Sequence, residues 1–288
     1  MNIIYVIFGD NIIYHIQTYL SIRTFQKQLD NSDKIFVMTT KPELYKHGGV
    51  NVIPISDDTI HEWEGDYHFF WRVKIKAMEY MSNHYPDGHL LYLDTDTFLF
   101  GQLSNIKERL LRGEGIMHKD EGHPSLMMSR SKKMWKQIAN KYYDGIKLGM
   151  KHHMFNAGVV AIPQEKIDIV ISKALAICDS MLAQGVERVV IEQYSLSISL
   201  YENTILTEGN NCIGHYWGNK EEWERFAMDI ISKAYMQNLS IKEEISLIND
   251  SDLYKIPIHI HHSSTAAKIR KIIDRIFKDK NIIYIKQN

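Results

Sequence analysis

The sequence predicts an α/β protein in which a mainly parallel sheet is flanked by helices on both faces. Three observations point to this class. Short apolar runs typical of buried parallel strands recur at residues 3–8, 34–39, 51–55 and 90–93. Segments with apolar residues at helical spacing, 12–29 and 71–81, follow the first run and precede the last. Turn residues such as Pro86-Asp87-Gly88 separate these elements, and the resulting βαβ rhythm favours a parallel sheet.

The second half of the chain follows a looser pattern. We expect helices at 106–111, 167–183, 189–200 and 223–236, and strands at 155–162, within 204–212 and at 257–262. The stretch 118–129 reads as irregular. Because we find no internal repeat and no low-complexity linker, we expect one domain over 1–262 and a basic amphipathic tail over 263–288. The segment 266–280 of that tail can lie on an anionic membrane surface or pack its apolar stripe on the domain.

Composition narrows the function classes. The 288 residues are enough for a sizeable core, and 34 basic against 35 acidic residues give no reason to expect a nucleic-acid partner. Cys178 and Cys212 show neither metal-type spacing nor a disulfide framework, which fits a reducing, cytoplasmic setting. The apolar N-terminus has no basic residue ahead of it and reads as a first strand, not as a signal peptide. No apolar stretch reaches the roughly 20 residues that a spanning helix needs.

The strongest chemical signal is Asp94-Thr95-Asp96, which directly follows the buried strand at 90–93. Open α/β sheets bind ligands at the carboxyl ends of their strands. Strand alternation would place Asp94 and Asp96 on one face. Two close carboxylates repel each other unless a cation lies between them, and Mg²⁺ or Mn²⁺ suits oxygen ligands. The alternative is a strand end that carries two solvated aspartates.

Two enzyme families carry a similar string. With Thr97, the segment resembles the haloacid-dehalogenase-like phosphatases, in which Asp94 would be a nucleophile for a phosphoryl group. It also resembles the DXD motif of GT-A glycosyltransferases, in which the pair holds a metal that binds a nucleotide-sugar diphosphate. Three strands precede the motif and no later acidic cluster completes a phosphatase magnesium site, so the context favours the transferase.

Further stretches resemble GT-A enzymes, most nearly the family-8-like group, over most of residues 3–220. These are Phe8-Gly9-Asp10-Asn11 with Tyr14, the basic helix start Phe70–Lys76, Met154-Phe155-Asn156-Ala157-Gly158, and Gly214–Lys220. The resemblance implies a mixed α/β GT-A sheet and a nucleotide site at Phe8, Gly9, Asp10, Tyr14, Arg72, Lys76, Thr95 and Lys220. It also implies a donor-sugar site at Asn156, Ala157, Gly158 and Asp120.

The resemblance further implies that His215 completes a metal site with Asp94 and Asp96. An imidazole beside two carboxylates favours Mn²⁺ over Mg²⁺. His259 and His261, on one face of the expected strand at 257–262, are the rival ligands. The family spacing between histidine and lysine is one residue longer than His215 to Lys220, which leaves the geometry of this loop open.

Sugar transfer needs the acceptor hydroxyl to be deprotonated, and a carboxylate is the usual base in inverting enzymes. Glu192 and Gln193 resemble the acid–glutamine pair at the start of a helix in this fold, so they are the catalytic candidates. The alternative for Glu192 is an acid stabilised by a helix N-terminus. The sequence thus predicts a metal-dependent transferase that moves a sugar from a nucleotide-sugar, expected to be a UDP-sugar, onto a glycan or lipid-linked glycan, as in surface polysaccharide synthesis. A phosphatase, or a carbohydrate- or nucleotide-binding protein with a degenerate site, is the alternative.

Overall fold

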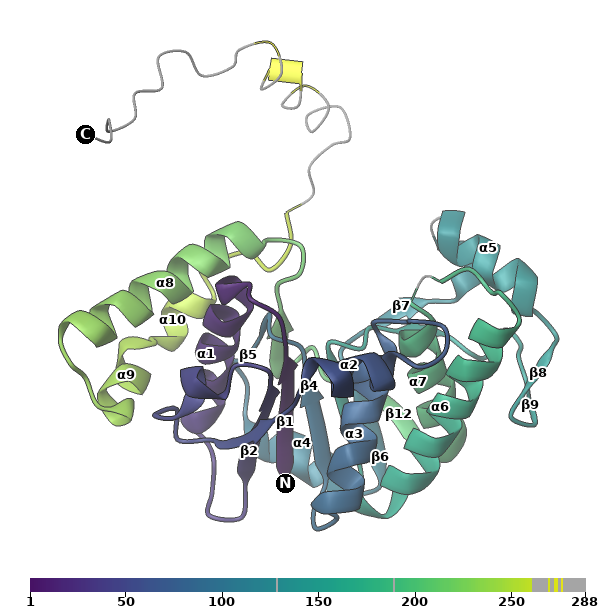
Figure 1. Ribbon diagram of the computed structural model, residues 1–288, viewed down its shortest axis with the longest axis horizontal. Helices are drawn as coiled ribbons and strands as arrows, with labels where there is room; N and C mark the ends of the chain where they lie inside the picture. Colours follow the sequence, from purple (N-terminus) through teal and green to yellow (C-terminus); the bar gives the residue numbers. More distant parts are fainter. Residues whose placement is uncertain (128, 189, 261–268, 270–271, 274–275, 277–288) are drawn as a thin grey trace.

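The computed structural model describes residues 1–127, 129–188 and 190–260, together with residues 269, 272, 273 and 276. A seven-stranded sheet with helices on both faces forms its centre (Figure 1). The spatial order of its strands is β12-β6-β11-β4-β1-β2-β3. Every neighbouring pair is parallel except those of β11, which runs antiparallel to β4 and β6. The strands are β1 (Asn2–Ile7), β2 (Lys34–Thr39), β3 (Asn51–Pro54), β4 (Leu90–Leu93), β6 (Glu114–Met117), β11 (Val159–Ile162) and β12 (Ile205–Glu208).

Strand alternation divides the core between the two faces of the sheet. Ile4 and Phe36 pack on one face under α3 (Arg72–His84), α6 (Ile167–Ala183) and α7 (Ile191–Asn203). Ile3 and Tyr5 pack on the other face under α1 (Ile12–Gln26) and α4 (Leu103–Leu111). Because both faces are covered at the centre of the sheet, the central strands β4 and β11 are apolar and buried throughout instead of alternating with polar residues.

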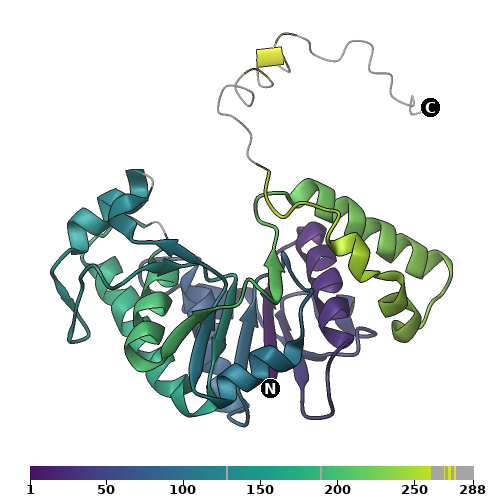
Figure 2. The ribbon, with the colours of Figure 1, turned by 180° about the vertical axis from the view of Figure 1, so that it is seen from behind.

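Further helices lie at the two ends of the sheet. Helices α8–α10 pack beside α1 at one end, and α5–α7 lie at the other (Figure 2). The remaining helices are α2 (Asp57–Glu64), α5 (Ser129–Ile138), α8 (Lys220–Met236), α9 (Ile241–Leu247), α10 (Asp250–Leu253) and the 3-10 turns η1 (Pro42–Tyr45), η2 (Pro124–Leu126) and η3 (Gln164–Lys166). Three short pairs complete the strands: β7 (Asp120–Gly122) with β10 (Met154–Phe155), β5 (Thr97–Leu99) with β13 (Ile213–His215), and β8 (Tyr142–Tyr143) with β9 (Ile146–Lys147).

The structure corrects three of the expected elements. The strand expected at 155–162 is interrupted, because the Asn156 side chain accepts the backbone N–H of Gly158 and turns the chain between β10 and β11. The stretch 118–129, expected to be irregular, contains β7 and η2. At 257–260 the described chain forms only an isolated bridge between Gly218 and His259, and 261–262 lie outside the described residues.

The tail expected at 263–288, with its segment 266–280, lies outside the described residues apart from the four isolated positions. None of the helices in the described part of the chain is both long and apolar enough to cross a membrane.

Candidate active site

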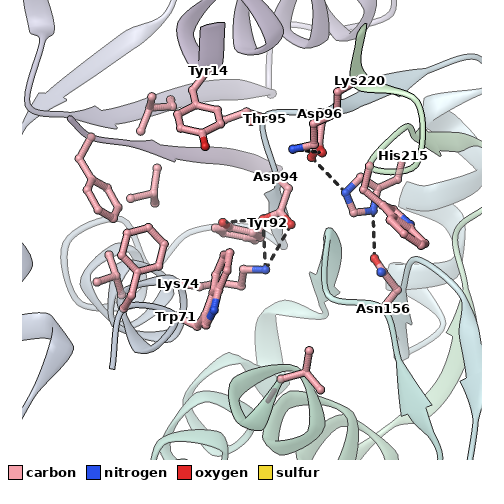
Figure 3. A pocket seen from close by; sticks show the side chains of 17 residues that line it. Tyr14, Trp71, Lys74, Tyr92, Asp94, Thr95, Asp96, Asn156, His215 and Lys220 are labelled. Atoms are coloured by element: carbon pink, nitrogen blue, oxygen red, sulfur yellow. Dashed lines mark hydrogen bonds and ion pairs between the residues drawn. The ribbon is translucent and has the colours of Figure 1, made fainter. Parts of the chain in front are cut away.

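A cavity of about 520 Å³ opens at the carboxyl ends of β1 and β4 (Figure 3). These neighbouring strands mark the point where the sheet order reverses, since β2 and β3 continue on one side of β1 and β4 lies on the other. Open α/β sheets bind their ligands at such switch points. Residues that end both strands line the cavity, including Phe8 after β1 and Asp94, Thr95 and Asp96 after β4. The aspartate motif therefore lies where the topology places a ligand.

The two aspartates lie in a turn and not in a strand. β4 ends at Leu93, and the chain turns through Thr95 and Asp96 before β5 begins. The turn is held by the Thr97 hydroxyl, which donates to the Asp94 carbonyl at 2.8 Å, and by the Asp94 N–H, which donates to the Gly158 carbonyl at 2.8 Å. Contrary to the expectation from the sequence, Asp94 and Asp96 therefore do not share a strand face, although both carboxylates reach the same space (Figure 3).

His215 joins the two aspartates because β13 pairs antiparallel with β5. In that register His215 lies opposite Thr97, directly after the aspartate turn. Its Nε2 is 3.0 Å from Oδ1 of Asp96, and one ligand atom from each of the three residues lies within 4.8 Å of the others. His259, the described rival, instead packs against Trp217, while His261 lies outside the described residues.

The donor set fits a divalent cation. Nδ1 of His215 is 3.0 Å from Oδ1 of Asn156, and the same oxygen accepts the Gly158 N–H, which fixes the orientation of the amide. Nδ1 therefore carries a ring proton and donates to Asn156, while Nε2 donates to the Asp96 carboxylate and would offer its lone pair to a metal ion that replaced its proton. A metal ion between Nε2 and the carboxylates of Asp94 and Asp96 would satisfy all of them, with Asn156 orienting the imidazole from behind. Asp94, Asp96 and His215 thus form a candidate site for a divalent metal.

Two lysines flank the aspartates from opposite sides (Figure 3). Nζ of Lys220, the first residue of α8, is 2.8 Å from Oδ2 of Asp96. Nζ of Lys74, in the first turn of α3, is 3.1 Å from Oδ1 of Asp94 and donates to the Ala157 carbonyl at 3.0 Å. Lys74 was missed by the sequence reasoning. The available signal was its position between Arg72 and Lys76, which places it on the opposite, inward face of the helix.

Neighbouring charges keep Asp96 and Lys220 ionised in spite of their burial. Burial alone would raise the pKa of Asp96, but the hydrogen bond and charge of His215, together with Lys220, outweigh it and hold that pKa well below its ordinary value. Burial would lower the pKa of Lys220, but attraction by Asp96 outweighs it and leaves the pKa raised. Both side chains are therefore ionised at neutral pH.

Aromatic side chains form the outer wall of the cavity. Phe8, Tyr14, Phe70, Trp71 and Trp217 all line it. The rings of Phe8 and Phe70 are 5.1 Å apart, and Phe70 meets Trp71 edge-on. About half of the Trp71 surface and half of the Trp217 surface is exposed. Such exposed aromatic faces can stack on a planar base or on the apolar face of a sugar ring.

Several expected site residues lie outside this cavity. Asp10 is exposed and pairs with Lys41, and Gly9 does not line the cavity. Arg72 binds Asp179 through two nitrogens, and Lys76 binds Glu79; both line a different cavity, so neither reaches the aspartates.

The sugar-site and catalytic candidates also lie mainly behind the cavity surface. Asn156 lines the cavity, whereas Ala157 and Gly158 are fully buried beneath it. Glu192 and Gln193 are buried at the start of α7 and do not line the cavity. Oε2 of Glu192 has no hydrogen-bond partner among the described residues, and burial raises the pKa of this carboxyl although Lys74 opposes the shift. Asp120 binds His153 and the Gly122 N–H.

Comparison with known proteins identifies the fold. No protein-family model matches the sequence, and a search of curated proteins finds no match. Among solved structures, the galactosyltransferase LgtC in complex with donor and acceptor sugar analogues superposes with a TM-score of 0.52 and 13% identity, over 80% of this chain and 96% of that one. Mouse xyloside xylosyltransferase 1 gives a TM-score of 0.47 at 9% identity, over 72% and 85% of the two chains. The bifunctional glycosyltransferase WbbM gives 0.42 at 13% identity, over 72% and 38%.

The fold assignment rests on the galactosyltransferase, which is matched over nearly its whole length. Both the mostly parallel sheet with one antiparallel strand and the helices on its two faces agree with it. The chain therefore has the mixed α/β fold of GT-A glycosyltransferases.

Proposed function

We propose that this protein is a metal-dependent glycosyltransferase that moves a sugar from a UDP-sugar to a glycan or lipid-linked glycan. One observation carries the proposal. Asp94, Asp96 and His215 converge beside Lys74 and Lys220 in the switch-point cavity of a GT-A fold. Three metal-ligating side chains beside two lysines suit a metal-bound diphosphate. The proposed reaction needs such a site, because its leaving group is a nucleoside diphosphate.

The charges of the cavity support a diphosphate ligand. Its lining contains two lysines and two aspartates, whose charges cancel. A divalent cation held by the aspartates would leave the cavity positive, which complements a diphosphate. Lys220 would then provide a point charge for phosphate oxygens. We assign Lys74 the same task on the other side, in place of Arg72 and Lys76, which face the separate cavity.

The remaining walls supply places for the nucleoside and the sugar. Phe8 and Tyr14 offer aromatic faces to a base, and Thr95 lies between the aspartates on the cavity surface. Asn156 has one amide N–H left for a sugar hydroxyl after its contact with Glu121. Ala157 and Gly158 follow Asn156 in the chain and would bring backbone close to the sugar. Gln193 accepts the Ala157 N–H, and we keep Glu192 and Gln193, at the start of α7, as the catalytic candidates.

A divalent cation, when bound, would draw charge from the departing diphosphate. His215 favours Mn²⁺ over Mg²⁺ as that cation, since imidazole is a softer ligand than water or carboxylate. The protein residues hold the diphosphate between two lysines, orient the imidazole through Asn156 and keep Asp96 ionised. The motif resemblance to the family-8-like group supports a role in polysaccharide or lipopolysaccharide synthesis, and the pattern of the two cysteines supports a cytoplasmic setting. Residues 266–280 would suit contact with a membrane that carries the acceptor.

A panel of UDP-sugars tests this proposal. At least one should release UDP with Mn²⁺ and not with chelator, and transfer should follow when a glycan acceptor is added. Asp96→Asn should lower the rate by roughly 100-fold or more, since several kcal/mol of charge stabilisation are lost. Asp58→Asn, at an exposed position of α2, is the matched control. Phosphate release from a simple phosphoester that depends on Asp94, or metal-independent nucleotide binding without turnover, would refute the proposal.

A further inference from the structure

Glu121 does not line the cavity, but it contacts Asn156, which does. It belongs to β7, which pairs antiparallel with β10, and is partly buried there. Its Oε1 accepts from Nδ2 of Asn156 at 3.1 Å, and its Oε2 accepts from Nε2 of Gln193 at 3.0 Å. We propose that Glu121 is a positioning residue that holds these two amides and, through them, the turn that shapes the metal site.

Both amides have only one usable orientation. Oδ1 of Asn156 accepts the Gly158 N–H at 3.0 Å, and Oε1 of Gln193 accepts the Ala157 N–H at 3.1 Å. A backbone N–H can only donate, so the amide oxygens must face the backbone and the amide nitrogens must face residue 121. Two donors therefore converge on one side chain. A carboxylate has two acceptor oxygens for them, whereas an amide has only one.

The turn that these amides hold contacts two of the three candidate metal ligands, Asp94 and His215, and also Lys74. The Asp94 N–H donates to the Gly158 carbonyl at 2.8 Å, and Nζ of Lys74 donates to the Ala157 carbonyl at 3.0 Å. Nδ1 of His215 lies 3.0 Å from Oδ1 of Asn156, and its ring packs directly over Gly158. A shift of this turn would therefore move Asp94, Lys74 and His215 together.

The surroundings of Glu121 distinguish it from an ordinary surface acid. None of the ion pairs within the described chain includes it, and its carboxyl oxygens accept hydrogen bonds from two neutral amides instead of pairing with a cation. The neighbouring Asp120, in contrast, faces His153. A carboxylate whose partners are two fixed amides suits a structural clamp, and partners that orient metal ligands typically contribute about 10- to 100-fold to metal affinity.

Exchange of the two functional groups tests the clamp. In Glu121→Gln, the amide nitrogen of the new glutamine must face the amide nitrogen of Asn156 or of Gln193, so two donors meet. In Asn156→Asp, the new carboxylate faces the carboxylate of Glu121. In the double variant, the introduced amide at position 121 would donate to the introduced carboxylate at position 156 and still accept from Gln193. That carboxylate would keep accepting from His215 and the Gly158 N–H. We expect each single variant to bind Mn²⁺ about 10-fold or more weakly, and the double variant to recover most of that affinity. Free Mn²⁺ is measured by electron paramagnetic resonance.

Glu202→Gln is the control, because Glu202 also takes part in a side-chain hydrogen bond, with His152, but away from the metal site. A second readout needs no metal. The Ala157 and Gly158 backbone amides should exchange hydrogen about 10-fold faster or more in Glu121→Gln, and return toward wild type in the double variant.

The role of Glu121 in catalysis rests on the proposed function, whereas its role in holding the turn does not. The experiments can therefore refute either one separately. If wild type binds no Mn²⁺ or releases no UDP, the proposed function fails, while hydrogen exchange still decides the clamp. If wild type is active but Glu121→Gln matches it in Mn²⁺ affinity and in exchange, the clamp is refuted. Failure of the double variant to recover either quantity, when all variants unfold cooperatively, refutes it as well.

Discussion

Gly158 leaves the space in which the His215 ring lies. A methyl group added at this position would be 2.9 Å from Nε2 of His215 and closer still to Cε1 and Nδ1. Carbon atoms make favourable contacts at about 3.5–4.0 Å, so in Gly158→Ala the ring must move by roughly 1 Å or the turn must shift. Overpacking of this kind typically costs about 1–3 kcal/mol of folding stability.

Function should suffer as well as stability, because the displaced ring belongs to His215, a candidate metal ligand. A misplacement of about 1 Å can lower an enzymatic rate by about 100-fold. We therefore expect Gly158→Ala to lose about 10- to 100-fold in Mn²⁺ affinity and about 100-fold in Mn²⁺-dependent UDP release. Isothermal titration with Mn²⁺ and a coupled UDP assay measure the two effects.

Gly149→Ala is the control, since a methyl group there meets nothing within 4 Å. It should match wild type in both assays. If Gly158→Ala binds Mn²⁺ and turns over like Gly149→Ala, then His215 is not a ligand or the ring can move freely, and the packing argument is refuted.

Three more outcomes follow from the site. Mn²⁺ at 100 times its dissociation constant should stabilise wild type by about 2.7 kcal/mol in thermal unfolding and should leave Asp96→Asn unchanged; equal stabilisation of both would show that the ion binds elsewhere. Lys74→Met should weaken Mn²⁺·UDP binding by about 10-fold or more, whereas Lys76→Met should not, because Lys76 faces the other cavity; equal losses in fluorescence titrations would contradict the assignment. Glu192→Gln should gain stability over wild type as pH rises above about 4.5, since burial raises the pKa of Glu192 in the folded state, so the unfolded chain ionises first and wild-type stability falls through that window. Urea unfolding at pH 4.5 and pH 8 measures this difference, and an advantage that is the same at both values would contradict it.

Local pattern was enough for the central strands and the motif. The apolar runs at 34–39 and 90–93 match β2 and β4 residue for residue, because a strand buried on both faces needs an unbroken apolar sequence. The aspartates were recognised for the same reason, since charged residues directly after such a strand stand at the ligand edge of the sheet. The interruption of the strand expected at 155–162 could not be predicted from the apolar pattern, because it depends on the hydrogen bond from the Gly158 N–H to the Asn156 side chain.

The sequence by itself determined the α/β class, the parallel core and the Asp94-Thr95-Asp96 motif, because each depends on neighbours along the chain. The tertiary structure decided which distant groups meet that motif. His215 reaches Asp96 across 119 residues through the pairing of β13 with β5, and Lys74 faces the aspartates whereas Arg72 and Lys76 face another cavity. Glu121 contacts Asn156 and Gln193 only in the folded protein, in which β7 pairs with β10. Such contacts depend on how distant segments of the fold pack, whereas a motif or a helical spacing names a residue without giving its partners.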